Sequence, residues 1–248
     1  MAAKETADFG YRRVAAREHT RLVYDVFARV AQRYDLMNDL MSGGIHRLWK
    51  AQMIERLDPR PGQILLDVAG GTGDIARRFV TRAGSGGAIV CDINRSMLEA
   101  GRARGLDMGD GGALHWLCGN AEALPIASAS VDAYTIAFGL RNVTRIPVAL
   151  AEARRVLKPG GRFLGLEFSN VERPLLKRAY DLYSFTVLPR LGAVVARDRD
   201  AYQYLIESIR RFPDRQRLAA LMRQAGLEQV TARPLSGGIA AIHSGWRL

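Results

Sequence analysis

A run of apolar residues that ends in a carboxylate and continues into a glycine-rich turn is the part of the sequence best suited to chemistry. The segment 65–74 reads LLDVAGGTGD, so Asp67 closes the apolar run and Gly71, Thr72 and Gly73 follow it. Glycine allows tight turns and a close approach of the backbone to a ligand. The pattern predicts a nucleotide-like ligand at the carboxyl end of a strand.

A second acid, Asp92, closes the next apolar run, 87–92. It follows the glycine turn by about 20 residues, a spacing that suits a carboxylate holding the ribose hydroxyls of a cofactor. The glycine pattern alone is weak, because 71–76 also fits the dinucleotide fingerprint and a βα turn that binds nothing. Further segments must decide which cofactor is bound.

The segment 119–125, GNAEALP, supplies groups that could contact an adenine ring. The side-chain oxygen of Asn120 could accept a hydrogen bond from the adenine amino group, and the backbone N–H of Ala121 could donate to a ring nitrogen. A dehydrogenase would not need this segment, so an adenosine ligand of another kind is favoured.

The apolar pattern predicts the elements that must position these groups. Strands are expected at 64–69, 88–92, 114–118, 131–137 and 162–168, and helices at 73–83, 95–104, 146–157, 173–190, 200–211 and 214–225. A terminal β-hairpin is expected from 227–232 and 235–243. The alternation of strands and helices predicts a doubly wound α/β fold with right-handed crossovers.

Ahead of the first strand, apolar residues at helical spacing predict a helical cap over 17–58, with helices at 17–39 and 45–56. Residues 1–16 are polar and are expected to be a flexible N-terminus. We expect a single domain over 17–248, with a lid or substrate insertion at 172–212.

In this order, the motifs resemble those of the Rossmann-like S-adenosylmethionine-dependent methyltransferases. The shared motifs are the acid-glycine turn, the ribose acid, the NAEALP segment and LKPGG at 157–161. The resemblance implies a seven-stranded sheet that ends in an antiparallel hairpin. One departure is Ala69, where the general pattern has its first glycine. The remaining glycines are expected to preserve the turn.

Segments outside the cofactor core are similar to the ubiquinone/menaquinone biosynthesis C-methyltransferase family. They are 34–50 (YDLMNDLMSGGIHRLWK), 138–143 (FGLRNV), 180–192 (YDLYSFTVLPRLG) and 201–213 (AYQYLIESIRRFP). The resemblance covers 22–248. It implies methyl transfer from S-adenosylmethionine to a ring carbon of a polyprenylated quinol: a 2-methoxy-6-polyprenyl-1,4-benzoquinol, a demethylmenaquinol, or both.

The family's cofactor contacts carry over to Thr72, Asp92, Asn120 and Ala121. Ala137 stands where the family often has serine, so one hydroxyl contact to the cofactor is expected to be missing. The sulfonium methyl is already activated, and the sequence has no His-rich or Cys-rich ligand spacing, so no metal is expected.

Methylation at carbon needs an electron-rich ring, which a quinol supplies when a hydroxyl ortho to that carbon loses its proton. Arg141 is the predicted phenolate stabiliser, because a guanidinium stays charged; the alternative is a structural salt bridge. Tyr34 is predicted to contact substrate or cofactor, the alternative being a core aromatic. His46 could move a proton near neutral pH, or be structural. Glu167 could orient a water or the quinol hydroxyl, or make a structural hydrogen bond.

The apolar insertion 172–200 and the helix at 22–41 could form a lid and tunnel for a prenyl tail; ordinary lid packing is the alternative. No apolar run approaches the ~20 residues of a membrane span. The net charge of +11 is spread along the chain without a basic run, which argues against nucleic acid. A positive surface could attract anionic lipid headgroups, so peripheral membrane contact is expected.

Cys91 and Cys118 are both expected to be reduced and buried, which indicates the cytoplasm. A homodimer or a quinone-biosynthesis complex is a further expectation. Two other functions stay open. One is methylation of another small molecule, such as a sterol or a phospholipid amine. The other is a cofactor-binding scaffold without turnover, against which the full motif set argues.

Overall fold

A mixed β-sheet of seven strands organises the fold in this computed structural model, which describes residues 6–30, 39, 42–108, 112–169, 171, 178 and 199–248. The strands are β3 (Ile64–Val68), β4 (Gly87–Asp92), β5 (Leu114–Cys118), β6 (Val131–Ala137), β7 (Leu157–Phe168), β8 (Glu228–Leu235) and β9 (Ala240–Arg247). Their order is β5-β4-β3-β6-β7-β9-β8, with β9 antiparallel to both of its neighbours. The predicted doubly wound sheet with a terminal hairpin is confirmed.

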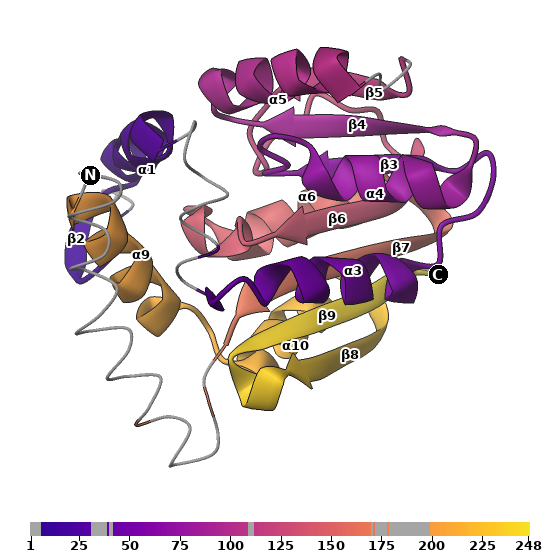
Figure 1. The fold of residues 1–248 in the computed structure, drawn as a ribbon. Coiled ribbons are helices and arrows are strands. Elements are labelled where there is room, and N and C mark those ends of the chain that lie inside the picture. Colours follow the sequence, from indigo (N-terminus) through magenta and orange to yellow (C-terminus); the bar gives the residue numbers. More distant parts are fainter. Residues whose placement is uncertain are drawn as a thin grey trace.

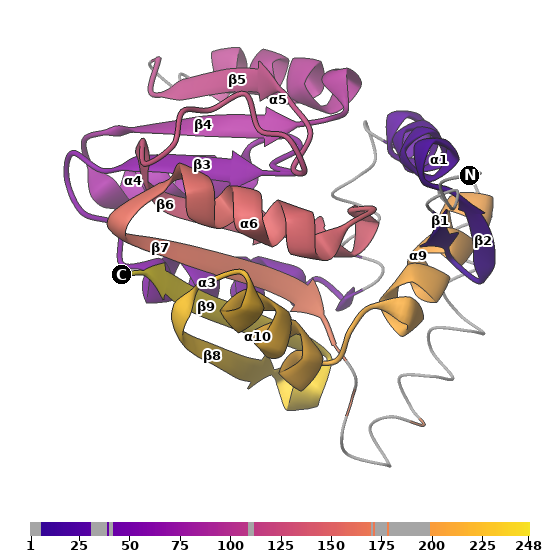
Figure 2. The same cartoon turned by 180° about the vertical axis from the view of Figure 1, so that it is seen from behind.

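Helices cover both faces of this sheet, as the apolar pattern requires. One face carries α3 (His46–Leu57), α4 (Asp74–Ala83) and α5 (Arg95–Met108) (Figure 1). The other carries α6 (Ile146–Val156) and α10 (Arg215–Gln224) (Figure 2). Met53 and Phe79 are fully buried on the first face, and Leu150 and Met222 on the second. Burying such side chains stabilises each helix by about 1.5–3 kcal/mol per residue.

Beyond the carboxyl ends of the parallel strands lies a separate group of elements: α1 (Ala16–Val30), α9 (Arg199–Arg211) and a two-stranded ribbon of β1 (Thr6–Phe9) and β2 (Arg12–Ala15). In Figure 2 the arrowheads of β3, β4 and β5 point toward α1. Of the predicted cap segment 17–58, α1 therefore faces the edge of the sheet where the motif residues gather, whereas α3 packs on a face of the sheet.

Within the segment 1–16, for which a flexible N-terminus is expected, residues 6–9 and 12–15 form two paired strands. Gly10 makes the turn with a φ of +59°, a conformation that glycine adopts at little cost. The Phe9 ring stacks on Tyr204 with 4.3 Å between ring centroids, and the Tyr11 N–H donates to Glu207. Both partners belong to α9, so the local sequence gives no sign of this support.

Strand β7 begins five residues before the predicted 162–168, because the LKPGG turn is part of the sheet. Leu157 pairs with Val131 and Arg162 with Ala133, so the intervening residues form an irregularity in the ladder. Two short 3₁₀ helices, η2 (Leu140–Asn142) and η5 (Ser236–Gly238), follow β6 and β8. The predicted helix at 173–190 falls outside the described residues except for residue 178.

Both cysteines are free, and Cys91 is buried as expected. The expectation for Cys118 was wrong: it is exposed, because it ends β5, the edge strand of the sheet. Within the residues described here, no helix is both long enough and apolar enough to cross a bilayer.

Candidate active site

A cavity, called here the main cavity, lies between α1 and the carboxyl edge of the sheet. With its opening to solvent it measures about 800 Å³. Its walls come from α1, from the turn after β3, from the end of β4, from the loop after β5 and from the turn after β6. Apolar side chains of α1, among them Val23 and Phe27, face the polar groups of the sheet edge across it. This is the crevice in which open α/β sheets bind ligands.

Asp92 connects two walls of the main cavity. Its Oδ2 accepts a hydrogen bond of 2.9 Å from the Gly71 N–H, and its Oδ1 accepts one of 2.8 Å from the Asn94 N–H. Burial raises the pKa of Asp92 to about 6, although the backbone N–H groups of Asn94 and Gly71 act in the opposite direction. Each carboxylate oxygen can accept a second hydrogen bond, so Asp92 can still serve a ligand in the cavity.

Asp67, at the carboxyl end of β3, is fully buried. Its Oδ1 accepts a hydrogen bond of 2.8 Å from the Thr135 hydroxyl, whereas its Oδ2 has no hydrogen-bond partner in the part of the chain that the structure describes. Burial raises the pKa of Asp67 to about 7. The carboxyl borders a small hollow beside the glycine turn, where Lys50 pairs with Asp74 at 2.9 Å instead of with Asp67.

The glycine turn is built as predicted. Gly71 lines the main cavity, Thr72 borders the small hollow, and Gly73 is the N-cap of α4, with a φ of +81°. Ala69 also adopts a left-handed conformation, with a φ of +50°. A Cβ built on Gly139 would collide with the Ala69 side chain, so a glycine at 139 leaves the space that the alanine needs.

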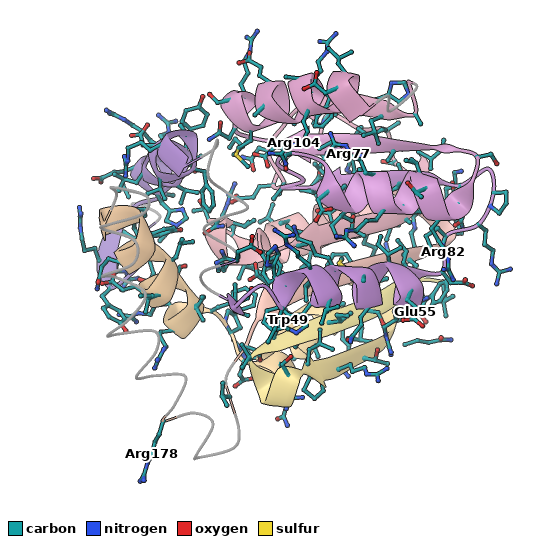
Figure 3. All side chains as sticks on the ribbon, viewed as in Figure 1. Trp49, Glu55, Arg77, Arg82, Arg104 and Arg178 are labelled. Atoms are coloured by element: carbon teal, nitrogen blue, oxygen red, sulfur yellow. The ribbon has the colours of Figure 1, made fainter. Side chains whose placement is uncertain are left out.

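The guanidinium of Arg77 holds the glycine turn in place through hydrogen bonds. Arg77 of α4 donates to the Thr72 carbonyl at 2.6 Å and to the Gly101 carbonyl of α5 at 2.9 Å. Its guanidinium also lies over the Trp116 ring, and Figure 3 shows Arg77 between α4 and α5. These contacts fix the position of the turn relative to the next two elements of the sheet.

The loop after β5 contributes Asn120 and Ala121, and both line the main cavity. The Asn120 Oδ1 accepts a hydrogen bond of 2.9 Å from the Glu122 N–H, which makes an Asx turn. The predicted amide oxygen therefore already has one partner, with its second lone pair left for a ligand. Glu122 also forms a 2.6 Å ion pair with Arg145, which anchors this loop to the start of α6.

Arg141 and Glu167 are brought together as a buried ion pair. The Arg141 Nη1 lies 2.8 Å from the Glu167 Oε2, with their side chains 1% and 2% exposed. The same Nη1 donates to the Phe138 carbonyl, and the Arg141 N–H donates to the Glu167 Oε1. Within the described residues Arg141 does not line the main cavity; it borders a second one, beside α10. This geometry favours the structural alternative for both residues.

His46 is the first residue of α3 and is not among the residues that line the main cavity or the small hollow. Its Nδ1 is 3.0 Å from the Ser42 hydroxyl, which also accepts a hydrogen bond from the His46 N–H. Burial lowers the pKa of His46, which keeps the ring neutral near pH 7. Both contacts tie His46 to Ser42 at the start of α3. Tyr34 lies outside the described residues.

Several residues of the main cavity were missed from the sequence. Tyr24 and Thr20 come from α1, and Asn142 and Thr144 come from the turn after β6. Asn142 and Arg141 are neighbours in the 138–143 motif, so this motif offered two candidates for a substrate contact. The prediction from sequence named only the charged one, Arg141. The apolar spacing of α1 indicated a buried face, but not what that face covers.

Comparison with known proteins identifies the family. Residues 14–247 match the ubiE/COQ5 methyltransferase family. The chain belongs to this family. It is 58% identical to the ubiquinone/menaquinone biosynthesis C-methyltransferase UbiE of Paracoccus denitrificans, over 99% of this chain and 98% of that protein. It is 57% identical to the protein of the same name from Rhodopseudomonas palustris, over 98% of each.

Solved structures agree on the fold. A SAM-dependent methyltransferase from Aquifex aeolicus superposes with a TM-score of 0.60 at 15% identity, covering 80% of this chain and 89% of that one. A SAM-dependent methyltransferase from Thermotoga maritima gives a TM-score of 0.61 at 21% identity, over 91% of this chain and 100% of that one. At such identities the likeness supports the fold alone.

As a member of the ubiE/COQ5 family, the protein is a C-methyltransferase with S-adenosylmethionine as its cosubstrate. The residues present fit that molecule. Asp67 keeps a buried carboxylate oxygen without a partner among the described residues, beside a turn whose glycines allow a close approach. Asp92 adds a second carboxyl in the adjoining cavity. In the part of the chain that the structure describes, neither of these buried acids forms an ion pair with a cationic side chain, which suits a ligand that carries positive charge.

Proposed function

We propose that this chain transfers a methyl group from S-adenosylmethionine to a ring carbon of a polyprenylated quinol, in ubiquinone biosynthesis, menaquinone biosynthesis or both. The observation that supports this most strongly is the composition of the main cavity. Carboxyl and amide groups gather at the sheet edge, and apolar side chains of α1 form the opposite wall. A cofactor of polar and charged groups and an apolar aromatic substrate could meet there.

In this proposal the cofactor lies along the sheet edge. Asp92 accepts hydrogen bonds from the ribose hydroxyls, and the segment of Asn120 and Ala121 receives the adenine. Asp67 serves the amino group of the methionyl part. Gly71, Thr72 and Gly73 supply the close-approaching turn. These roles rest on the positions described above, since all these residues line the main cavity or the small hollow, or start the adjoining helix.

S-adenosylmethionine supplies an activated methyl group when it is bound, so the chain's own residues mainly orient the quinol and stabilise the phenolate. We place Arg141 and Glu167 beneath this site as a pair that holds the 138–143 turn. A guanidinium that a carboxylate already neutralises is a weak partner for a phenolate. His46 then has a structural role, and a contact from Tyr34 stays a prediction.

We further infer a peripheral contact with the membrane, because the prenyl tail of the substrate lies in lipid. Two apolar side chains at the start of α3, Ile45 and Leu48, are 39% and 63% exposed. The net charge of +11 adds attraction to anionic headgroups. The predicted lid at 172–200 lies almost wholly outside the described residues. A homodimer or a biosynthetic complex stays a prediction.

A direct assay tests the proposed reaction. The purified protein is given S-adenosylmethionine with a labelled methyl group and, separately, a short-tailed methoxybenzoquinol and a short-tailed demethylnaphthoquinol. We expect a product with the label on a ring carbon, identified by mass spectrometry and NMR. Label on nitrogen of a phospholipid amine, or on a sterol, with none on either quinol would contradict the proposal.

A vesicle assay tests the membrane contact separately. Binding should rise with the anionic lipid content and fall as salt screens the charges over a Debye length of about 8–10 Å. Leu48→Ser should weaken binding at every salt concentration, because it removes apolar contact and leaves the charge unchanged. Equal binding to neutral and anionic vesicles at low salt would contradict the electrostatic part.

A further inference from the structure

The turn after β6 places an amide, and not the neighbouring guanidinium, in the wall of the main cavity. Asn142 is the last residue of η2 and lines this cavity together with Gly139 and Val143. Arg141 points the other way, into its buried pair with Glu167. At this turn the side-chain amide of Asn142 therefore lines the cavity, and the Arg141 guanidinium does not.

The amide of Asn142 has a defined orientation. The Tyr204 hydroxyl donates to the Asn142 Oδ1 at 3.0 Å, and the Asn142 Nδ2 lies 3.5 Å from the Phe138 carbonyl. The amide nitrogen carries two hydrogens, so one remains after the long contact to Phe138. With its oxygen bonded to Tyr204, the side chain is oriented so that its amide nitrogen keeps a donor for the cavity.

Tyr204 is well suited to fix this orientation. It is only 3% exposed, and its ring stacks on Phe9 from the N-terminal ribbon. Burial raises the pKa of Tyr204 well above its ordinary value, so the hydroxyl keeps its proton and remains a donor. A neutral tyrosine that donates to Oδ1 disfavours the flipped amide, in which an N–H group would face the hydroxyl proton.

Two other polar residues that line the cavity close to this turn, Thr144 and Asn94, are already engaged. The Thr144 hydroxyl lies 2.9 Å from the His19 ring and 3.3 Å from the Thr20 hydroxyl. The Asn94 amide nitrogen donates to the Tyr24 carbonyl, and its oxygen accepts from two backbone N–H groups. Asn142 therefore combines access to the cavity, a free donor and a fixed orientation.

We propose that Asn142 donates a hydrogen bond to the quinol oxygen ortho to the methylated carbon, and that Tyr204 acts as the positioning residue that holds the amide as a donor. This inference rests on the proposed function. In the step, the quinol hydroxyl proton passes to water, and the ring carbon bonds the methyl group as the carbon–sulfur bond breaks, leaving its electron pair on sulfur. The proton displaced from that ring carbon re-forms the hydroxyl, so one proton is released overall. A neutral donor stabilises the phenolate without pairing with it so strongly that its reactivity is lost.

The test uses the full chain, a short-tailed quinol and four variants. Asn142→Ala should lower kcat by about 100-fold, in the range for the loss of one oriented donor. Asn142→Asp should lower it further, because a carboxylate repels the phenolate. Tyr204→Phe keeps the ring but lets the amide turn, so a smaller loss of about 5-fold is expected. Tyr11→Phe, which removes an exposed hydroxyl from the ribbon, should leave kcat unchanged.

A spectroscopic readout separates this role from a structural one. A redox-inert nitrophenol bound in place of the quinol reports its own ionisation by absorbance. Wild type should hold the probe pKa below that of Asn142→Ala by about one unit, equivalent to a tenfold change in ionisation. The probe pKa in Tyr204→Phe should lie between the values in wild type and in Asn142→Ala. S-adenosylmethionine affinity, measured by calorimetry, should change less than about twofold in all variants.

The outcomes are distinct. If wild type methylates the quinol but Asn142→Ala keeps its turnover and the probe pKa, the inference is wrong while the proposed function stands. If Tyr204→Phe changes neither quantity, the positioning role is wrong. If wild type binds S-adenosylmethionine but methylates neither quinol, the proposed function fails, and the inference fails with it.

Discussion

The two sides of the proposed site treat buried charge in opposite ways. On the proposed cofactor side, made by the turn after β3, Asp92 and the loop after β5, neither Asp67 nor Asp92 forms an ion pair with a cationic side chain in the described part of the chain, and burial raises the pKa of both. On the proposed substrate side, made by α1, the turn after β6 and the neighbouring α9, Glu167 is paired with Arg141 at 2.8 Å. The first side keeps its acids available for a ligand, whereas the second uses an ion pair to hold its shape.

The largest expected effect comes from breaking the pair on the substrate side. Glu167→Ala leaves the Arg141 guanidinium without its carboxylate in the protein interior, which should destabilise the fold by about 3–5 kcal/mol. Urea unfolding followed by circular dichroism measures this. Arg141→Ala should behave alike, so any loss of turnover in that variant has to be corrected for unfolded protein.

A double replacement sharpens the result. Glu167→Leu combined with Arg141→Met removes both charges and should recover most of the lost stability, because buried ion pairs can be replaced by apolar residues at little cost. A double variant as unstable as Glu167→Ala alone would show that the contacts of Arg141 with the backbone, and not the pair, hold the turn.

On the cofactor side the same kind of change should affect binding more than folding. Asp92→Ala removes hydrogen bonds to a charged group worth about 1.5–3 kcal/mol, so S-adenosylmethionine affinity should fall at least about tenfold. Asp92→Asn is the matched control: it keeps one acceptor and should lose less. Calorimetry that finds wild-type affinity in the alanine variant would remove Asp92 from the cofactor site.

The raised pKa values predict how binding depends on pH. Asp67 titrates near 7 in the folded chain, against about 3.9 in an unfolded one. Its protonated form therefore contributes stability that is fully present below about pH 4 and is lost as the pH rises through about 7. A cationic ligand favours the ionised carboxylate, so S-adenosylmethionine affinity should rise about tenfold between pH 5.5 and 7.5.

Asp67→Asn provides the control for that prediction, since an amide does not titrate in this range. Its affinity for S-adenosylmethionine should be lower and nearly independent of pH over the same interval, apart from the smaller contribution of Asp92. An affinity of wild type that falls as the pH rises would contradict the assignment of these carboxyls to a cationic ligand.

This contrast also explains what could be predicted from the sequence. The proposed cofactor side depends on motifs with a characteristic spacing: Asp92 bonds to Gly71 and Asn94, and Asn120 bonds to Glu122, so the sequence itself carries the information. The order of strands and helices in the sheet could be predicted for the same reason, because it is visible in the alternating apolar runs of the sequence. The glycine turn was predicted correctly even with Ala69 in it.

The substrate side depends on contacts between distant parts of the chain. Tyr204 reaches Asn142 across 62 residues, and His19 reaches Thr144 across 125. No local pattern indicates such pairs, and so the sequence favoured Arg141 as the substrate contact and did not point to Asn142, which lines the main cavity. The buried partner of Arg141 is Glu167, which belongs to β7 and lies outside the 138–143 motif in the sequence.

The smallest expected effect lies within the cofactor side, at the one residue that departs from the general glycine pattern. A left-handed conformation costs a non-glycine residue about 1–2 kcal/mol, and Ala69 adopts one with a φ of +50°. Ala69→Gly removes that cost but adds about 0.5–1 kcal/mol of backbone entropy, which leaves a net gain of about 0.5–1 kcal/mol. For a chain of this size the melting temperature should rise by about 1–4 °C. The Ala69→Gly variant should also bind S-adenosylmethionine at least as well as wild type.

Gly139→Ala gives the opposite control, because its new Cβ would collide with the Ala69 side chain, and it should lower the melting temperature. Combining Gly139→Ala with Ala69→Gly should restore part of that loss. Failure of the double variant to recover any stability would mean that Gly139 is needed for another reason, its closeness to Ile136.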